Sequence, residues 1–152
     1  MSATNHTMAN SPTAFAPAER AGLEELQASI RTAANSPLVS TLLEATDVVP
    51  LLLNRNRQVV AFNERALQRL GFGRAEGILG LRPGEFMACS NVPGSPCGCG
   101  TGESCRDCGL VGAVLAAQES GRPAEQECLL TVQRDGHDTA LELRVRATPP
   151  TK

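Results

Sequence analysis

Five of the six cysteines in this chain lie within the twenty residues from Cys89 to Cys108, and this cluster limits how the middle of the chain can fold. Their spacing is C-x7-C-x-C-x5-C-x2-C, and several glycines are interleaved with them. Glycine at this density disfavours a regular helix or strand, because each glycine loses much backbone entropy on folding. The sequence therefore predicts a loop that gathers several thiolates around one metal centre.

The redox state of these cysteines depends on the cellular compartment. The first fifteen residues have neither the basic region nor the apolar region of a secretory signal. The most apolar run, residues 38–53, is interrupted by Glu44, Asp47 and Pro50 and is too short to span a bilayer. We therefore expect a cytoplasmic protein with no membrane partner. In a reducing compartment, metal binding or redox chemistry is favoured over a structural disulfide framework.

Charge and aromatic content argue against nucleic-acid binding. The formal net charge is −2, so the chain has no overall basic field to attract a phosphate backbone. The chain has no Trp and no Tyr, which are side chains that stack on single-stranded bases. We expect no nucleic-acid partner.

The N-terminal part of the chain divides into a tail and a helix. Residues 1–16 are small and polar and are expected to be disordered. A helical pattern opens at Pro17 and runs to about Ala34, so that residues 17–35 form an N-terminal helix. One apolar stripe makes this helix a candidate for homodimerisation, and packing on its own domain is equally compatible with the pattern.

Residues 36–88 alternate short helices with a first hairpin. Strand propensity and a polar turn predict a pair of strands at 48–53 and 58–62. Ser36 and Asn63 are placed to cap helices. The expected helical segments are 38–45, 64–70 and 74–80, and residues 82–85 form a turn.

A longer helix and a second hairpin follow the cysteine loop. The helix is expected from Cys105 to Glu119, and the strands at 124–134 and 137–148 are joined by Asp135-Gly136, a two-residue hairpin signal. With this turn, Leu130 pairs with Leu141, and Cys128 pairs with Leu143 and lies on the core face as a small core residue. The expected fold class is α+β with an antiparallel sheet.

Residues 36–148 resemble a PAS domain, a common sensory fold of bacterial signalling proteins. The resemblance rests on the run from Asn63 to Phe72 with Glu76 and Leu79-Gly80, and on the strand 141–148 with its closing Ala-Thr-Pro. It is more specific for a cysteine-bearing subset found in bacterial sensor proteins, often sensor kinases. The motifs of that subset are Arg82-Pro83-Gly84-Glu85 with Cys89, Gly98-Cys99-Gly100, and Cys105-x-x-Cys108-Gly109. The residues after 148 form only the short tail 149–152, so we expect the usual fifth strand of the family to be missing from this chain.

The resemblance implies four metal ligands, Cys89, Cys99, Cys105 and Cys108, with Cys97 as a substitute ligand. Physical reasoning supports this set weakly. Cys97 and Cys99 would point to opposite sides of an extended segment. Cys105 and Cys108 would share one face at the start of a helix, where the helix dipole favours thiolate.

The expected function is a signal-sensing PAS module without a catalytic domain. An iron–sulfur cluster, [4Fe–4S] or [2Fe–2S], is favoured over zinc because a sensor needs a centre whose state can change, and zinc has no redox chemistry. A redox or oxygen input would pass to a signalling partner such as a histidine kinase in a two-component system. The main alternative is a PAS module stapled by zinc that serves interaction or dimerisation.

Other chemistry is less well supported by the sequence. Cys105-Arg106-Asp107-Cys108 resembles a dithiol oxidoreductase motif, but it follows a glycine-rich loop where a buried strand would be expected. His6 lies in the expected tail and His137 begins a strand beside a turn, so both are expected to be solvated. No catalytic constellation emerges from the remaining residues.

Overall fold

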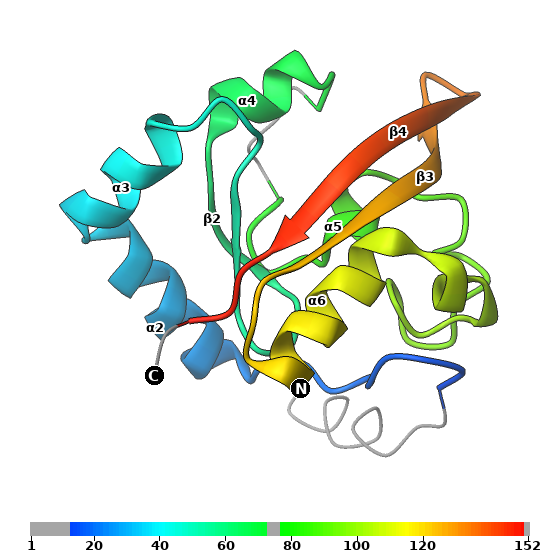
Figure 1. Ribbon diagram of the computed structural model, residues 1–152, viewed down its shortest axis with the longest axis horizontal. Coiled ribbons are helices and arrows are strands. Elements are labelled where there is room, and N and C mark those ends of the chain that lie inside the picture. Colours follow the sequence, from blue (N-terminus) through cyan, green and yellow to red (C-terminus); the bar gives the residue numbers. More distant parts are fainter. Residues whose placement is uncertain (1–12, 73–76, 151–152) are drawn as a thin grey trace. The chain divides into compact units, whose positions relative to one another are not determined.

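The computed structural model of the protein describes residues 13–72 and 77–150, and within these ranges the fold is α+β (Figure 1). The chain divides into two compact units. We call residues 19–86 the aliphatic unit. We call residues 13–18 together with 87–150 the cysteine unit, and describe each unit by itself.

Short helices surround a small hairpin in the aliphatic unit. The strands β1 (Leu51–Leu53) and β2 (Val59–Phe62) pair antiparallel, which confirms the first predicted hairpin. The helices are α2 (Leu23–Ala34), α3 (Pro37–Glu44), α4 (Glu64–Arg69) and α5 (Pro83–Phe86). Both predicted caps are confirmed, since the side chains of Ser36 and Asn63 accept hydrogen bonds from the first turns of α3 and α4.

Three sequence expectations in this unit need correction or fall partly outside the described residues. The first helix begins at Leu23 and not at Pro17. The residues before it are extended because they hydrogen-bond elsewhere: the Ala21 N–H donates to Gln58 Oε1 at 2.9 Å. The predicted turn at 82–85 overlaps the single helical turn α5, which ends at Phe86. Of the predicted segment 74–80, residues 74–76 lie outside the described residues, and 77–80 form turns.

The aliphatic unit has a hydrophobic core and a buried polar network. Val59, Leu67 and Ile78 are buried at the centre of the core, and Phe72 and Phe86 meet edge to face beside them. Arg82 is fully buried, and its guanidinium donates to the carbonyl oxygens of Asn56 at 2.9 Å and Glu19 at 2.7 Å. This arginine ties the chain before α2 to the turn after β1, and buried charge of this kind needs such partners.

A long hairpin and one helix form the regular part of the cysteine unit (Figure 1). The strands β3 (Ala124–Arg134) and β4 (His137–Ala147) pair antiparallel around Asp135-Gly136, whose positive φ values suit a tight two-residue turn. The register joins Leu130 to Leu141 and Cys128 to Leu143, as predicted. Cys128 is buried, which confirms its place on the core face. Helix α6 (Gly109–Ser120) packs against this hairpin.

The helix predicted from Cys105 to Glu119 is interrupted, which corrects the sequence expectation. Residues Glu103–Asp107 form the 3-10 helix η1, and α6 starts only at Gly109. Between them Cys108 is extended, with φ −79° and ψ 117°. Cys105 and Cys108 therefore do not share one face of a helix.

Sheet topology supports the α+β class but not a larger sheet. Within residues 13–72 and 77–150, the strands form two separate two-stranded antiparallel sheets, β1–β2 and β3–β4. No helix in the described ranges is long and apolar enough to cross a membrane.

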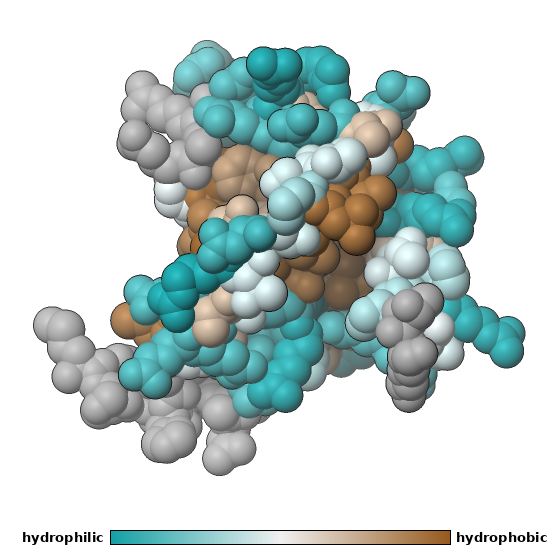
Figure 2. All heavy atoms as spheres, turned by 90° about the vertical axis from the view of Figure 1, so that its left-hand side faces the viewer, coloured by the Kyte–Doolittle hydropathy of each residue, from teal (hydrophilic) through white to brown (hydrophobic). Residues whose placement is uncertain are grey.

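Apolar side chains are partly exposed on the surface. Figure 2 shows hydrophobic atoms gathered near the middle of the face that it presents. In the aliphatic unit, large exposed apolar side chains include Leu23, at 67% of its full exposure, and Leu38, Leu42 and Val48. Of the α2 residues on the predicted apolar stripe, Ala33 is buried and Leu23 is not.

Candidate metal and thiol site

The cysteine loop begins by running beside strand β3. Ser90 N–H donates to Thr131 O at 2.8 Å, and Gln133 N–H donates to Ala88 O at 2.9 Å. These bonds place Cys89 opposite Val132 in an isolated antiparallel bridge. The first cysteine of the loop is therefore fixed to the sheet by backbone hydrogen bonds.

A tight turn holds the middle of the loop. Gly98 and Gly100 have φ values of 89° and 90°, which are accessible to glycine without a steric cost. Thr101 is fully buried; its hydroxyl donates to Gly98 O at 2.7 Å and accepts from Cys97 N–H at 2.9 Å. The hydroxyl thus fixes the backbone on both sides of Gly98.

A segment far away in the sequence also holds this turn. Ala14 N–H donates to Thr101 O and Ala16 N–H donates to Gly100 O, both at 2.9 Å. Ala16 is fully buried, and it packs with Cys99 and Val111 in one apolar cluster. Small polar and apolar residues in this segment gave no signal of these contacts in the sequence.

The start of α6 lies directly against β3. A Cβ atom on Gly109 would collide with the carbonyl oxygen of Glu127 and would lie 3.2 Å from Cα of Cys128. Only glycine permits this approach of the two backbones. The approach brings Cys108, the residue before α6, beside Cys128 on the strand.

Cys108 and Cys128 form a close pair of thiols, with 3.8 Å between their sulfur atoms. A hydrogen bond from the Cys128 thiol, aided by the N–H groups of Val111 and Leu110, lowers the pKa of Cys108 to about 6 against the opposing effect of burial. The same hydrogen bond, followed by burial, raises the pKa of Cys128. Around neutral pH the pair therefore carries one thiolate and one thiol, and the thiolate lies at the N-terminus of α6.

Cys105 and Cys108 lie in the electrostatic neighbourhood of Cys89. Burial is the largest cause that raises the pKa of Cys89, and charges on Cys108 and Cys105 raise it further against a hydrogen bond from the Asn91 backbone. Cys105 is buried, and its sulfur lies 3.9 Å from Ser95 Oγ. Three of the four predicted ligands are thus close enough for their charges to interact.

All four predicted ligands lie in the cysteine unit, and none of the six cysteines forms a disulfide. Cys89, Cys99 and Cys105 are buried, and Cys108 is half-buried. Within residues 13–72 and 77–150, however, no three Cys, His, Asp or Glu side chains meet in a group that could hold a metal ion. The donor chemistry suits a thiophilic metal, while full coordination requires the sulfur atoms to move closer together.

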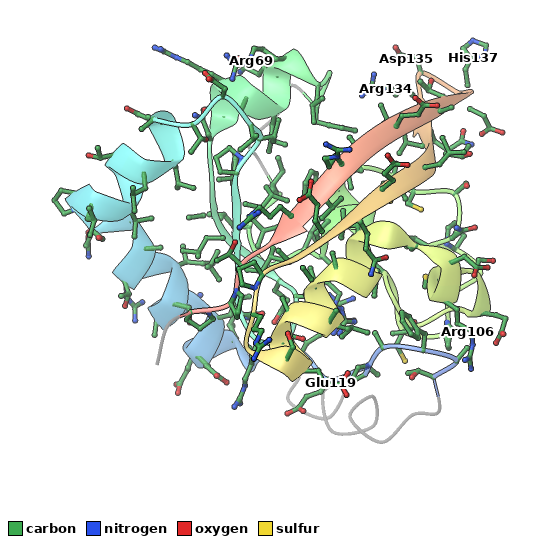
Figure 3. The ribbon with its side chains drawn as sticks, in the orientation of Figure 1. Arg69, Arg106, Glu119, Arg134, Asp135 and His137 are labelled. Carbon is green, nitrogen blue, oxygen red and sulfur yellow. The ribbon has the colours of Figure 1, made fainter. Side chains whose placement is uncertain are left out.

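The charged and imidazole side chains of Glu103, Arg106 and His137 lie on the surface of the cysteine unit. Arg106 forms an ion pair with Glu103 at 3.1 Å on the surface of the loop (Figure 3). His137 is exposed and lies with Arg134 and Asp135 at the tip of the β3–β4 hairpin (Figure 3). His6 lies outside the described residues.

The contact of Cys128 with Cys108 is the feature that sequence reasoning missed. Strand register predicts that Cys128 lies on the core face. The loop has no such pattern, so its sequence does not predict which of its residues contacts Cys128. The signal that could have found the contact is Gly109, a glycine at the start of a helix where a close backbone approach needs one.

Comparisons with known proteins give no relative for this chain. No family model, no curated protein and no solved structure matches it.

Proposed function

We propose that this protein is a PAS-like regulatory module whose cysteine loop binds a metal centre through Cys89, Cys99, Cys105 and Cys108. An iron–sulfur cluster is the favoured centre. The observation that supports the proposal most is the burial, partial for Cys108, of thiols from distant parts of one loop in one unit, with charges on Cys105 and Cys108 that act on Cys89. Buried thiolates repel one another, and a bound cation offsets that repulsion.

The loop is suited to respond to such a centre. Its residues are held by hydrogen bonds to β3, to residues 14–16 and through the hydroxyl of Thr101. If sulfur atoms of the loop must move to complete the coordination, then binding or loss of the metal changes these contacts. The change would reach helix α6 through Cys108 and the β3–β4 hairpin through Cys89 and Gly109. A signalling partner such as a histidine kinase would read that change.

Zinc is the second candidate, and one distance favours it. Two thiolates on one tetrahedral zinc lie about 3.8 Å apart, because Zn–S bonds are about 2.3 Å long. The sulfur atoms of Cys108 and Cys128 lie 3.8 Å apart. A zinc ion on these two sulfurs would staple α6 to the sheet and serve interaction or dimerisation, for which the exposed Leu23 of α2 offers a contact.

Anaerobic purification with metal analysis and a visible spectrum tests both candidates. The chain has no Trp and no Tyr, so absorption from a cluster would dominate its spectrum. We expect coloured protein with iron and sulfide, and loss of both when Cys89, Cys105 or Cys108 is replaced by Ser. Cys97→Ser is the matched control within the loop and should keep the centre. Colourless protein with stoichiometric zinc would replace the first candidate by the second, and protein without any metal would refute both.

Hydrogen exchange tests the signalling route separately. Removal of the metal should reduce amide protection in the loop, at the start of α6 and along β3. Equal protection of residues 105–147 with and without metal would contradict the route while leaving metal binding intact.

A further inference from the structure

We propose that Cys108 and Cys128 form a thiol–disulfide exchange site, which accepts low-molecular-weight disulfides and closes into a reversible disulfide between the start of α6 and strand β3. This site goes beyond the proposed metal centre, because it needs no metal and uses a cysteine outside the loop.

The geometry of the pair is close to that of a disulfide. The two sulfur atoms are 3.8 Å apart, and a bond would bring them to about 2.05 Å. The backbones are also close, since a Cβ atom placed on Gly109 would lie 3.2 Å from Cα of Cys128. A disulfide fails when its two Cα atoms are too far apart, and the close approach of the backbones at Gly109 favours the bond. To form it, the two sulfurs must approach by about 1.8 Å.

The two thiols differ in access, and the difference sets the order of events. Cys108 is half-buried, whereas Cys128 keeps only 3% of its full exposure. A small disulfide reaches Cys108 first. The sulfur of the buried Cys128 then lies within 3.8 Å of the sulfur of Cys108. Cys108 is therefore the attacking residue, and Cys128 is the resolving residue.

The structure disfavours the pairing that the Cys-x-x-Cys spacing suggests. Cys105 lies within η1, and its sulfur contacts Ser95 Oγ at 3.9 Å. Cys108 is extended after η1, and its sulfur contacts Cys128. In a dithiol oxidoreductase motif the two cysteines share the first turn of a helix. Here the break between η1 and α6 directs Cys108 to the strand.

The reaction balances as two successive exchanges. The Cys108 thiolate attacks one sulfur of the small disulfide; a mixed disulfide forms, and one small thiolate leaves. Cys128 loses its proton to solvent, and its thiolate attacks the Cys108 sulfur; the protein disulfide forms, and the second small thiolate leaves. In total, two protein thiols are oxidised, and one small disulfide is reduced to two thiols.

Digestion with trypsin reads out this pair directly. Trypsin cleaves after Arg106 and Arg134 but not at Arg122, which precedes Pro123. The peptide 107–134 therefore contains Cys108 and Cys128 and no other cysteine. The remaining four cysteines fall together in the peptide 75–106. The full chain, treated with a chelator, is incubated with oxidised glutathione, alkylated and digested, and each peptide is weighed by mass spectrometry.

We expect the peptide 107–134 to lose two hydrogen atoms and to take up no alkylating reagent, while the peptide 75–106 is alkylated. Cys128→Ser should stop the reaction at a mixed disulfide between Cys108 and glutathione. Cys105→Ser, the matched control, should form the disulfide as the wild type does. A crosslink between the two peptides would mean that Cys108 or Cys128 pairs with one of the four cysteines of residues 75–106, and that result would overturn the proposal. Full alkylation of both cysteines in wild-type 107–134 would overturn it as well.

The same experiment on untreated protein separates this inference from the proposed metal centre. If Cys108 binds metal, the untreated protein should resist oxidation and the chelated protein should not. If the chain binds no metal, both samples should form the disulfide equally, and the inference stands although the metal centre fails. If the metal is present and the chelated protein forms no disulfide, the metal centre stands and the inference fails.

Discussion

The two units of this protein hold their irregular segments by different means. In the aliphatic unit, the segments around the small hairpin pack on Val59, Leu67 and Ile78 and connect through the buried Arg82. In the cysteine unit, the loop 87–108 contains one short 3-10 helix, and sulfur atoms take up much of its buried interior.

This difference teaches where chemical change can act. Buried aliphatic side chains do not react with metals or oxidants. Thiols react with both, and their charge and their bonds change when they do. The packing of the aliphatic unit should therefore stay the same when metals or oxidants are added, whereas the packing of the cysteine loop should change.

Replacement of Arg82 should destabilise the aliphatic unit most. Arg82→Ala removes the donors that the carbonyl oxygens of Asn56 and Glu19 use, and it opens a cavity at a fully buried position. We expect a loss of about 3–5 kcal/mol in the free energy of unfolding, measured by urea denaturation. Arg55→Ala is the control, because the ion pair of Arg55 with Glu25 is exposed and should contribute less than about 1 kcal/mol. Equal effects of the two changes would contradict the role of Arg82.

A methyl group at Gly109 should separate α6 from β3. Gly109→Ala places Cβ against the carbonyl of Glu127, so the helix must shift at the cost of about 1–3 kcal/mol. The shift should also slow formation of the Cys108–Cys128 disulfide. Gly94→Ala lies in the loop before α6 with no atom within 4 Å of its new Cβ, and it should leave stability and disulfide formation unchanged. Denaturation and the mass-spectrometric assay together would detect both effects.

Regular elements with local signals could be predicted from the sequence. The caps at Ser36 and Asn63 and the turn at Asp135-Gly136 each depend on a few neighbouring residues, and strand register followed from the turn. The start of α2 was placed too early because the acceptor of the Ala21 N–H, Gln58, lies far away in the sequence. The break at Cys108 was missed because the spacing of Cys105 and Cys108 suits a helix as well.

The candidate site could be predicted only in part, because it also depends on contacts between residues that lie far apart in the sequence. The cysteines that gather in one unit could be identified from their density in the sequence. The pairing of Cys108 with Cys128 depends on the contact between Gly109 and Glu127, and the contacts of Ala14 and Ala16 depend on backbone groups of the loop. Contacts of this kind carry no side-chain pattern, so no periodicity or spacing reveals them.

Loss of one buried hydroxyl should loosen the loop by a small amount. Thr101→Val keeps the size of the side chain but leaves Cys97 N–H without the acceptor that Thr101 provides. We expect a loss of about 1 kcal/mol and faster amide exchange at residues 97–101. Thr101→Ser keeps the hydroxyl and should retain the slow exchange. If Thr101→Val exchanged as slowly as the wild type, packing and the backbone hydrogen bonds from Ala14 and Ala16 would hold the turn without the hydroxyl. The loop would then resemble the aliphatic unit more than we infer.

The pH dependence of Cys108 should provide the finest test of the comparison. In chelated protein, alkylation of Cys108 should reach half its maximal rate near pH 6, since the hydrogen bond from Cys128 lowers the pKa of Cys108 to about 6. At pH 7 this thiol should react only severalfold faster than an ordinary thiol of pKa about 8.5, because a thiolate of low pKa is also a weaker nucleophile. Cys128→Ala removes the hydrogen bond and should move the midpoint to higher pH, whereas Cys97→Ala should not.

The free energy of unfolding should also depend on pH through the thiol of Cys108. Because the folded pKa of Cys108 is below its unfolded value, the stability that its thiolate contributes is fully present above about pH 8.5. That contribution declines as the pH falls and is lost below about pH 6. If the alkylation rate of Cys108 in the wild type reached half its maximum near pH 8.5, Cys128 would not donate a hydrogen bond to Cys108. The start of α6 would then not depend on this hydrogen bond. The proposed chemical difference between the aliphatic unit and the cysteine unit would lose its main support.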